Sequence, residues 1–277
     1  MDIFDTHTHI FPTEIIKDRE RISQRDRRFA VIYGNPGARM TDIDGLLAYT
    51  KKEGITRCVA CGFSFQDDGL LGLSNDYILE AASQSPALIP FVQANPDNEK
   101  KAMDELERCF ALGARGVGEI ALYESALDDK SLRKLEGIAQ YAEEKQKILM
   151  LHTNEQVGHV YSGKVRADLG QIVRFIGKHR SMDIILSHLG GGLCFFELMP
   201  EVRESLVRTY YDIAAIPFIY SAEIYRFIEE FLWEKVFFGS DYPLLTAARY
   251  GAGISRMEQG KQAGIWSGNA KRVFGDI

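Results

Sequence analysis

Short apolar segments recur along the whole chain, and their regular spacing limits the fold more than any other feature. Eight of them are predicted to be buried strands, at residues 3–6, 57–61, 89–93, 115–119, 148–152, 183–187, 209–212 and 235–239. Most of their centres lie roughly 25–35 residues apart, the length of a strand, a helix and two loops. The stretches between them are amphipathic. Residues 132–144, for example, place Leu135, Ile138 and Ala142 on one helical face.

Eight strand–helix units in about 250 residues predict an α/β chain folded as one (β/α)8 TIM barrel, a single domain over residues 1–277. A doubly wound open sheet is the rival architecture, because alternating strands and helices alone do not separate the two. The first interval is longer than the others and contains a charged stretch within residues 10–50. This insertion is interpreted either as a solvated helical segment or as a lid, since insertions after a barrel strand lie on the catalytic face.

Side chains that bind metals stand at the carboxyl ends of five predicted strands. His7 and His9 follow the first strand, Glu119 ends the fourth, His152 ends the fifth, His188 follows the sixth and Asp241 follows the eighth. Two histidines at positions i and i+2 of an extended chain point the same way and can grip one cation. In a barrel all these strand ends converge on one mouth, whereas an open sheet would spread them along an edge. The pattern therefore favours the barrel and predicts a divalent-metal site.

Imidazole and carboxylate donors suit Zn²⁺ in nearly tetrahedral geometry, and Mn²⁺ or Fe²⁺ are also compatible with them. The pattern leaves open whether one or two ions bind. A metal that is purely structural is the non-catalytic alternative, but closed structural sites rarely combine convergent strand ends with mixed carboxylates. We therefore expect a catalytic ion.

Charge and cysteine content exclude several classes of protein. The chain has 33 Lys and Arg against 39 Asp and Glu, a net charge of −6, which gives no general attraction to nucleic acid or anionic lipid. No apolar run approaches the roughly 18 residues of a membrane helix, and the first residues lack a secretory signal. We expect a cytoplasmic protein with a small-molecule substrate and without nucleic-acid or membrane partners; a homodimer remains open. Cys58 and Cys61 lie on one predicted strand, and they are interpreted as buried core thiols.

Four motifs carry a resemblance to a known family. They are DTHTH at residues 5–9, SHLGGG at 187–192, YYD at 210–212 and GSDYP at 239–243. Together they resemble the amidohydrolase superfamily, and more closely its amidohydrolase-related metal-dependent hydrolases with aminocarboxymuconate-semialdehyde decarboxylase-like members. The resemblance covers nearly the whole chain. It implies His7, His9, His152 and Asp241 as metal ligands, and His188 as a group that orients or deprotonates the metal-bound water or binds a second ion.

The chain departs from part of the superfamily at the fourth strand. It has no lysine at the end of the fourth or fifth strand that could serve as a carbamylated bridge. Glu119 stands at the fourth-strand position instead, as in relatives similar to the TatD nucleases, where a glutamate bridges two ions. Glu119 is therefore predicted to be a metal ligand. The alternative is that it contacts the ligands without binding the ion itself. A nuclease would also need a basic groove, which the net charge disfavours.

The resulting hypothesis is a metal-dependent hydrolase that attacks a C–N or C–O bond of a small polar substrate, such as an amide or a lactone. Metal-activated water is the nucleophile, Asp241 the general acid and base, and His188 fixes the nucleophile or polarises the carbonyl. The alternative is a lyase, a decarboxylase or hydratase that acts on a small carboxylated substrate. A lyase needs a cation for the substrate carboxylate, and the chain offers Arg39, Lys164 or Arg249.

A polar loop follows the His152 strand directly and is a candidate for substrate binding. His159, Tyr161 and Lys164 lie within it and could bind an anionic or polar group of the substrate. The alternative is a surface loop that is held together by its own hydrogen bonds.

Overall fold

The computed structural model describes residues 2–275, and in this part of the chain eight parallel strands form one sheet in the order β1 to β8. The strands are β1 (Ile3–His9), β2 (Ile55–Cys61), β3 (Leu88–Val92), β4 (Gly116–Ile120), β5 (Ile148–Leu151), β6 (Ile184–Leu186), β7 (Thr209–Asp212) and β8 (Val236–Phe237). The region of β8 returns to β1, because the Thr6 N–H donates to the Phe238 carbonyl at 2.9 Å and the His9 N–H to the Tyr242 carbonyl at 2.8 Å. The predicted (β/α)8 barrel and its single domain are confirmed.

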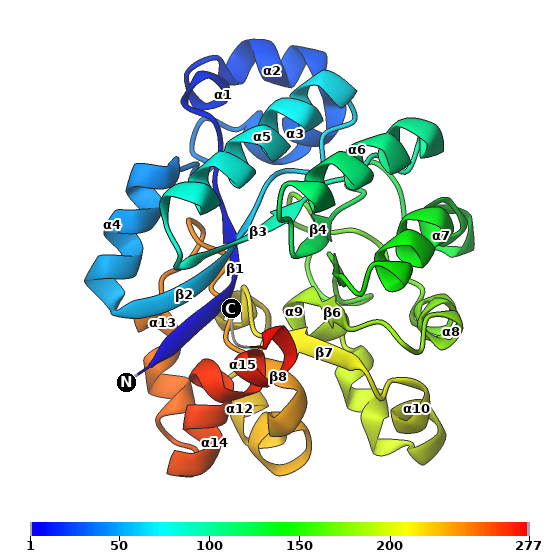
Figure 1. Ribbon diagram of the computed structural model, residues 1–277. Coiled ribbons are helices and arrows are strands. Elements are labelled where there is room, and N and C mark those ends of the chain that lie inside the picture. Colours follow the sequence, from blue (N-terminus) through cyan, green and yellow to red (C-terminus); the bar gives the residue numbers. More distant parts are fainter. Residues whose placement is uncertain (1, 276–277) are drawn as a thin grey trace.

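Helices surround the strands on the outside (Figure 1). They are α1 (Thr13–Lys17), α2 (Arg19–Arg25), α3 (Arg27–Tyr33), α4 (Ile43–Glu53), α5 (Asp68–Gln84), α6 (Glu99–Ala111), α7 (Asp129–Glu144), α8 (Leu169–Lys178), α9 (Ser187–Gly190), α10 (Pro200–Ser205), α11 (Ile216–Ile219), α12 (Ile224–Phe227), α13 (Ala248–Ile254), α14 (Gln259–Ala263) and α15 (Asn269–Phe274). Short 3-10 or π segments cover Leu193–Leu198, Ile228–Leu232, Trp233–Lys235 and Gly264–Gly268. In α7 the predicted face, with Leu135, Ile138 and Ala142, is buried. Within residues 2–275 no helix combines the length and apolar character needed to cross a membrane.

Each predicted strand overlaps an observed one, with differences at the ends. The largest is in β1, which continues through His9, so His7 and His9 belong to the strand and do not follow it. At the other extreme β8 is only two residues long. The shift in β1 strengthens the site prediction, because residues two apart on a strand project to the same side.

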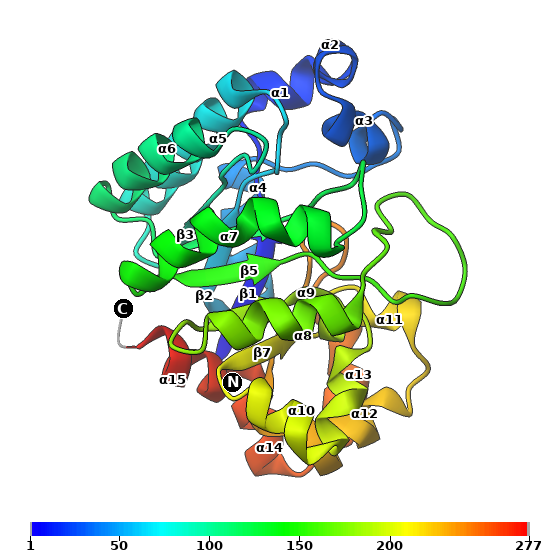
Figure 2. The same ribbon diagram turned by 90° about the vertical axis from the view of Figure 1, so that its right-hand side faces the viewer.

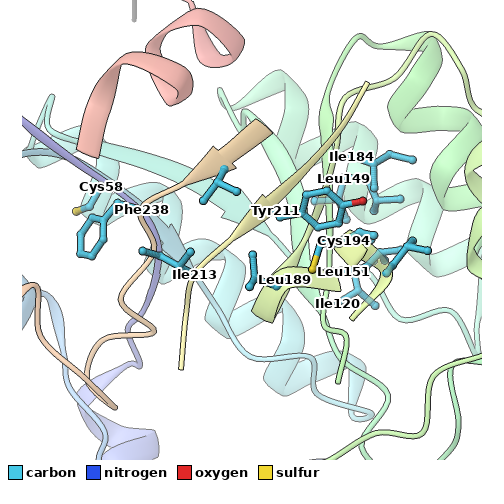
Figure 3. Packing of buried hydrophobic residues seen from close by; sticks show 14 of the residues in the cluster. Cys58, Ile120, Leu149, Leu151, Ile184, Leu189, Cys194, Tyr211, Ile213 and Phe238 are labelled. Carbon is cyan, nitrogen blue, oxygen red and sulfur yellow. The ribbon is translucent and has the colours of Figure 1, made fainter. Parts of the chain in front are cut away.

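Two layers of apolar side chains hold the barrel together. An outer layer lies between the strands and the helices; Figure 3 shows part of it, including Leu149 and Leu151 of β5 and Ile184 of β6. An inner layer fills the barrel, with Phe4, Phe91 and Phe237 completely buried. The four cysteines are free and buried, as predicted for Cys58 and Cys61, and burial raises the pKa of the Cys61 thiol to about 12.

The long first interval forms α1 to α4 and is fastened to the barrel (Figure 2). Its aromatic residues Phe11, Phe29 and Tyr33 pack against Phe63, which follows β2. Arg28 of α3 is 1% exposed. Its guanidinium donates to two carboxylates of distant barrel loops, at 2.7 Å to Glu124 and 2.9 Å to Asp97. The charge of Arg28 is therefore not solvated. The role of the segment as a lid stays a prediction.

Replacing Arg28 by alanine should loosen the α1–α3 segment, because a buried cation that binds two acids is lost. We expect about 2 kcal/mol less stability, below the usual cost of breaking a buried ion pair since both acids are partly exposed and can be hydrated. Urea unfolding and limited proteolysis within residues 10–40 measure both effects. Arg21→Ala is the control, because Arg21 forms only an exposed pair with Asp18. Equal stability and equal cleavage in the two variants would contradict this account.

Candidate metal centre

Four donor atoms from three strand ends meet at the mouth of the barrel. His7 Nε2 and His9 Nε2, both from β1, lie 3.0 Å apart. Glu119 Oε2, from β4, is 3.5 Å from the first nitrogen and 3.7 Å from the second. Asp241 Oδ1, after β8, is 3.7 Å and 3.5 Å from the same two nitrogens. Ligand atoms at about 2.1 Å from a tetrahedral ion are about 3.4 Å apart, so these separations match those of a coordination shell.

When their rings are neutral, the hydrogen bonds of the two β1 histidines leave both of these nitrogens without hydrogen. His7 Nδ1 faces Asp212 Oδ2 at 2.9 Å, and His9 Nδ1 faces the Gly62 carbonyl at 3.3 Å. Each Nδ1 carries the hydrogen, because these oxygen partners only accept. In the neutral rings two lone pairs then point at each other across 3.0 Å, a repulsion that either a proton or a metal ion between the two nitrogens removes. The donor set fits a metal ion.

A second group of donors adjoins the first. Glu119 Oε1 lies 2.9 Å from His152 Nδ1 and 3.6 Å from His188 Nε2, and the two ring nitrogens are 3.2 Å apart. The opposite nitrogens of these rings face carbonyl oxygens, His152 Nε2 that of Gly163 at 3.1 Å and His188 Nδ1 that of Ala214 at 2.9 Å. The two oxygens of Glu119 thus face different groups, and each group of three, His7–His9–Asp241 and Glu119–His152–His188, could hold an ion.

Two of the site residues have a backbone conformation that is unusual for residues other than glycine. His188 and Asp241 have φ angles of 57° and 58°, in the left-handed region. Such a conformation costs roughly 1–3 kcal/mol and persists only where the surrounding structure enforces it. Here hydrogen bonds enforce it: the His188 N–H donates to Asp212 Oδ1 at 2.9 Å, and the Asp241 N–H to the His7 carbonyl at 2.9 Å. Strain stored at these two residues is typical of a functional site.

Asp212, at the end of β7, supports the site from behind and was not singled out by the sequence analysis. It is completely buried, binds His7 Nδ1 through Oδ2, and accepts the N–H groups of His188 and Ala214 through Oδ1. A carboxylate behind a metal-binding histidine fixes the tautomer and the orientation of the ring. Its position at the end of a strand, in the same place as the predicted ligands, was the signal that could have identified it.

The charges of the cluster compensate one another. Burial would raise the pKa of Glu119, but His152 and His7 lower it well below its ordinary value. Burial also opposes the charge on His7, yet Glu119, Asp212 and Asp241 together raise its pKa well above the ordinary range. For Asp212 the effect of burial is outweighed by His7, and its pKa is lowered. Carboxylates in excess of cationic side chains make the mouth attractive for a positive ion.

A cavity of about 460 Å³ opens above these donors. Its wall consists mainly of aromatic and aliphatic side chains: Ile32, Tyr33, Ala38, Phe63, Tyr123, Phe218, Ile219, Pro243 and Leu244. Arg39 lies at the wall, where its Nη1 donates only to the Leu244 carbonyl at 3.4 Å. Among residues 2–275 no carboxylate forms an ion pair with it. Of the three cations named for a substrate carboxylate, Arg39 alone lines the cavity; Lys164 and Arg249 do not.

The loop after β5 contributes two of its three predicted substrate-binding residues to the cavity, His159 and Tyr161. The Tyr161 hydroxyl donates to Glu155 at 3.0 Å. Lys164 forms an ion pair with Glu155 at 2.9 Å and donates to the carbonyls of Val157 and His159. Its ammonium group thus stabilises the loop from within. A role of these residues in substrate binding stays a prediction.

All six residues predicted from the strand ends converge in the structure, although they are separated by more than 200 positions in the sequence. His7, His9 and Asp241 form one group, and Glu119, His152 and His188 form the other. Their roles as metal ligands stay predictions, as do the catalytic roles of Asp241 and His188.

Comparisons with known structures support the fold. The chain is similar to 5-carboxyvanillate decarboxylase from Sphingomonas paucimobilis, with 17% identity, a TM-score of 0.76, and coverage of 99% of this chain and 98% of that one. The 2,6-dihydroxybenzoate decarboxylase from Rhizobium has 15% identity, a TM-score of 0.68 and coverage of 99% and 98%. A dihydroxybenzoic acid decarboxylase from Polaromonas sp. JS666, with bound manganese and the inhibitor 2-nitroresorcinol, has 15% identity, a TM-score of 0.71 and coverage of 99% and 96%.

No curated protein matches the sequence. The family comparison is decisive, because the amidohydrolase model matches residues 4–275, nearly the whole barrel and every residue of the candidate metal centre. The chain therefore belongs to the amidohydrolase family, as its motifs predicted.

Proposed function

We propose that this protein is a metal-dependent lyase that decarboxylates a small, planar carboxylated substrate. This reverses the order of the two hypotheses drawn from the sequence, which placed hydrolysis first. The observation that carries the proposal is the cavity. It has an aromatic and aliphatic wall above a cluster of metal-binding side chains, and a guanidinium, Arg39, that pairs with no carboxylate of residues 2–275. The solved structures named above, which are decarboxylases of carboxylated aromatic rings, support the same reaction class.

Each part of the cavity suits one part of such a substrate. Phe63 and Tyr123, whose rings are stacked at 5.7 Å, offer a flat apolar surface for an unsaturated ring. Arg39 offers a charge-assisted hydrogen bond to a carboxylate. The cavity volume of about 460 Å³ lies within the range of small-molecule sites.

His7, His9, His152 and Asp241 are the proposed ligands, with Glu119 shared between the two groups of donors. Zn²⁺ and Mn²⁺ both accept imidazole and carboxylate ligands, and manganese is bound in the Polaromonas decarboxylase. We infer Mn²⁺ or Zn²⁺. A bound divalent cation supplies Lewis acidity to the oxygen atoms of the substrate.

The side chains can manage the charges and protons of a decarboxylation. His188 Nε2 carries a lone pair, because Nδ1–H is bound to the Ala214 carbonyl, so it can accept a proton from a substrate hydroxyl. When the bond between the ring and the carboxylate breaks, CO₂ leaves and the electron pair stays on the ring carbon. Asp241, whose side chain is 19% exposed, can take up a proton from solvent and deliver it to that carbon.

Hydrolysis of a C–N or C–O bond remains the second candidate, and one observation favours it. The two oxygens of Glu119 face two separate groups of donors, an arrangement that suits a pair of ions. Two-ion sites are common in hydrolases, where they hold both the attacking and the leaving oxygen. In this reaction Asp241 would take the proton of the attacking water and pass it to the leaving group.

The two candidates are separated by their products. Protein loaded with Mn²⁺ or Zn²⁺ is incubated with 2-hydroxybenzoate and the dihydroxybenzoates, and CO₂ release is measured. The same preparation is offered amides, lactones and a phosphate ester. Release of CO₂ without hydrolysis supports the lyase. Hydrolysis without CO₂ release from any carboxylate would overturn it in favour of the second candidate.

Replacing Asp241 by asparagine should abolish turnover and leave the fold intact, because the amide cannot shuttle a proton. Loss of a general acid or base costs roughly 10²–10⁴-fold in rate. Turnover is measured together with thermal unfolding and with bound metal by elemental analysis, so that loss of the proton donor is distinguished from loss of the ion. A variant that keeps full activity would remove Asp241 from the reaction.

Replacing Glu119 by glutamine should lower the number of ions per chain, since a neutral amide replaces a carboxylate that faces both groups of donors. Metal content is measured by elemental analysis on protein purified without chelators, then again after incubation with excess Mn²⁺ or Zn²⁺. Glu144→Gln, on the exposed face of α7, serves as the control. If both variants hold as much metal as the wild type, Glu119 is not a ligand.

Replacing Arg39 by glutamine should raise the KM for carboxylated substrates and change kcat little. A charge-assisted hydrogen bond contributes about 1.5–3 kcal/mol, so KM should rise by roughly 10- to 100-fold. Arg249→Gln is the matched control, because Arg249 lies outside the cavity lining. Equal KM values for the two variants would show that the substrate carboxylate binds elsewhere.

A further inference from the structure

Two tyrosines in the cavity wall have hydroxyl groups that bind nothing in the protein. Tyr33, from α3, is only 8% exposed, and Tyr123 follows β4; both line the cavity. Within residues 2–275 neither hydroxyl forms a hydrogen bond. The three most deeply buried tyrosines all donate instead, Tyr49 to Asp5, Tyr211 to Glu197 and Tyr250 to the Ser240 carbonyl. Both side chains line the cavity, so these hydroxyls are available to a molecule bound there.

Packing prevents the two rings from turning toward another partner. The Tyr33 ring lies 4.9 Å from that of Phe11 and 5.0 Å from that of Phe29. The Tyr123 ring lies 5.1 Å from the His152 ring, and Gly163 closes over its edge. Phe63 contacts both tyrosines, at 5.5 Å and 5.7 Å between ring centroids. The two hydroxyls are thus presented from a rigid aromatic wall that joins the α1–α4 segment to the barrel.

The surroundings keep both hydroxyls protonated. Burial is the main cause that raises the pKa of Tyr33, and the carboxylates of Asp241 and Glu119 add to it. The pKa of Tyr123 is raised by burial, by Glu119 and by the neighbouring Tyr33. At neutral pH each is a hydrogen-bond donor.

We propose that Tyr33 and Tyr123 together bind a second oxygen substituent on the ring of the substrate. The substrate class is then an aromatic carboxylate with two ring oxygens, one directed at the metal-binding cluster and one at the tyrosines. The oxygen atom accepts hydrogen bonds from the pair, which a hydrogen or a methyl group at that position cannot do. This inference rests on the proposed function and makes its substrate class more specific.

Binding of nitrophenols to the Mn²⁺-loaded protein tests the proposal without turnover, because a nitro group imitates a carboxylate but cannot leave as CO₂. Calorimetry compares 2-nitrophenol with its hydroxylated analogues, 2-nitroresorcinol, 3-nitrocatechol and nitrohydroquinone. We expect at least one analogue to bind about five- to tenfold more tightly than 2-nitrophenol, the gain of one or two net hydrogen bonds. Tyr33→Phe and Tyr123→Phe should each reduce this ratio about threefold, and the double variant should bring it near one.

The control is Tyr225→Phe, because Tyr225 is also 8% exposed but lies outside the cavity. It should keep the wild-type ratio, and the Kd of 2-nitrophenol should change less than about twofold in all variants. Thermal unfolding confirms that the variants are folded. An unchanged ratio in the double variant, or a wild type without preference for any hydroxylated analogue, would overturn the tyrosine assignment alone. A wild type that binds no nitrophenol and releases no CO₂ from hydroxybenzoates would overturn the proposed function as well.

Discussion

A single buried carboxylate, Asp212, connects the strand ends on which the candidate centre depends. It binds the His7 ring of β1 at 2.9 Å and the backbone N–H groups of His188 and Ala214 at 2.9 Å and 3.0 Å. A completely buried charge is stable only with such partners, and His7 is the main group that lowers its pKa against the effect of burial. The same contacts fix the tautomer of His7 and the left-handed backbone of His188. The orientation of two separate donors thus depends on one side chain.

The strands and the six donor residues could be predicted from the sequence, because both follow from local rules. Strand side chains alternate, and the carboxyl ends of barrel strands converge, so His7 and Asp241 could be paired without a structure. Asp212 also stands at a strand end, so the same rule indicated that it lies near the mouth. Its contact with His7, 205 residues away, could not be predicted, because the rule does not say which of the converging side chains meet. Nor could the left-handed conformations of His188 and Asp241 be predicted, because the sequence has no glycine at either position.

The α1–α4 segment shows why a charged stretch is ambiguous in a sequence. Arg28 stands among other charges and favours a solvated helix, yet it is almost completely buried between Glu124 and Asp97 of two barrel loops. Its burial could be inferred only from partners 96 and 69 residues away. By fastening α3 to the barrel, this contact also fixes Tyr33, which follows on the same helix. The position of a proposed recognition residue therefore depends on a structural ion pair.

The donor cluster by itself does not select between hydrolysis and decarboxylation, because the same imidazoles and carboxylates can serve both. The wall of the cavity, in contrast, suits one of the two reactions better than the other. Hydrolysis needs a water molecule beside the donors, and the apolar part of the wall, with Phe63, Phe218 and Leu244, does not bind one. Decarboxylation replaces a carboxylate charge by neutral CO₂ once the ring carbon has taken up its proton, and an apolar wall favours this loss of charge. In the proposed reaction Arg39 holds the carboxylate, and the apolar wall then favours the loss of CO₂ over the entry of water.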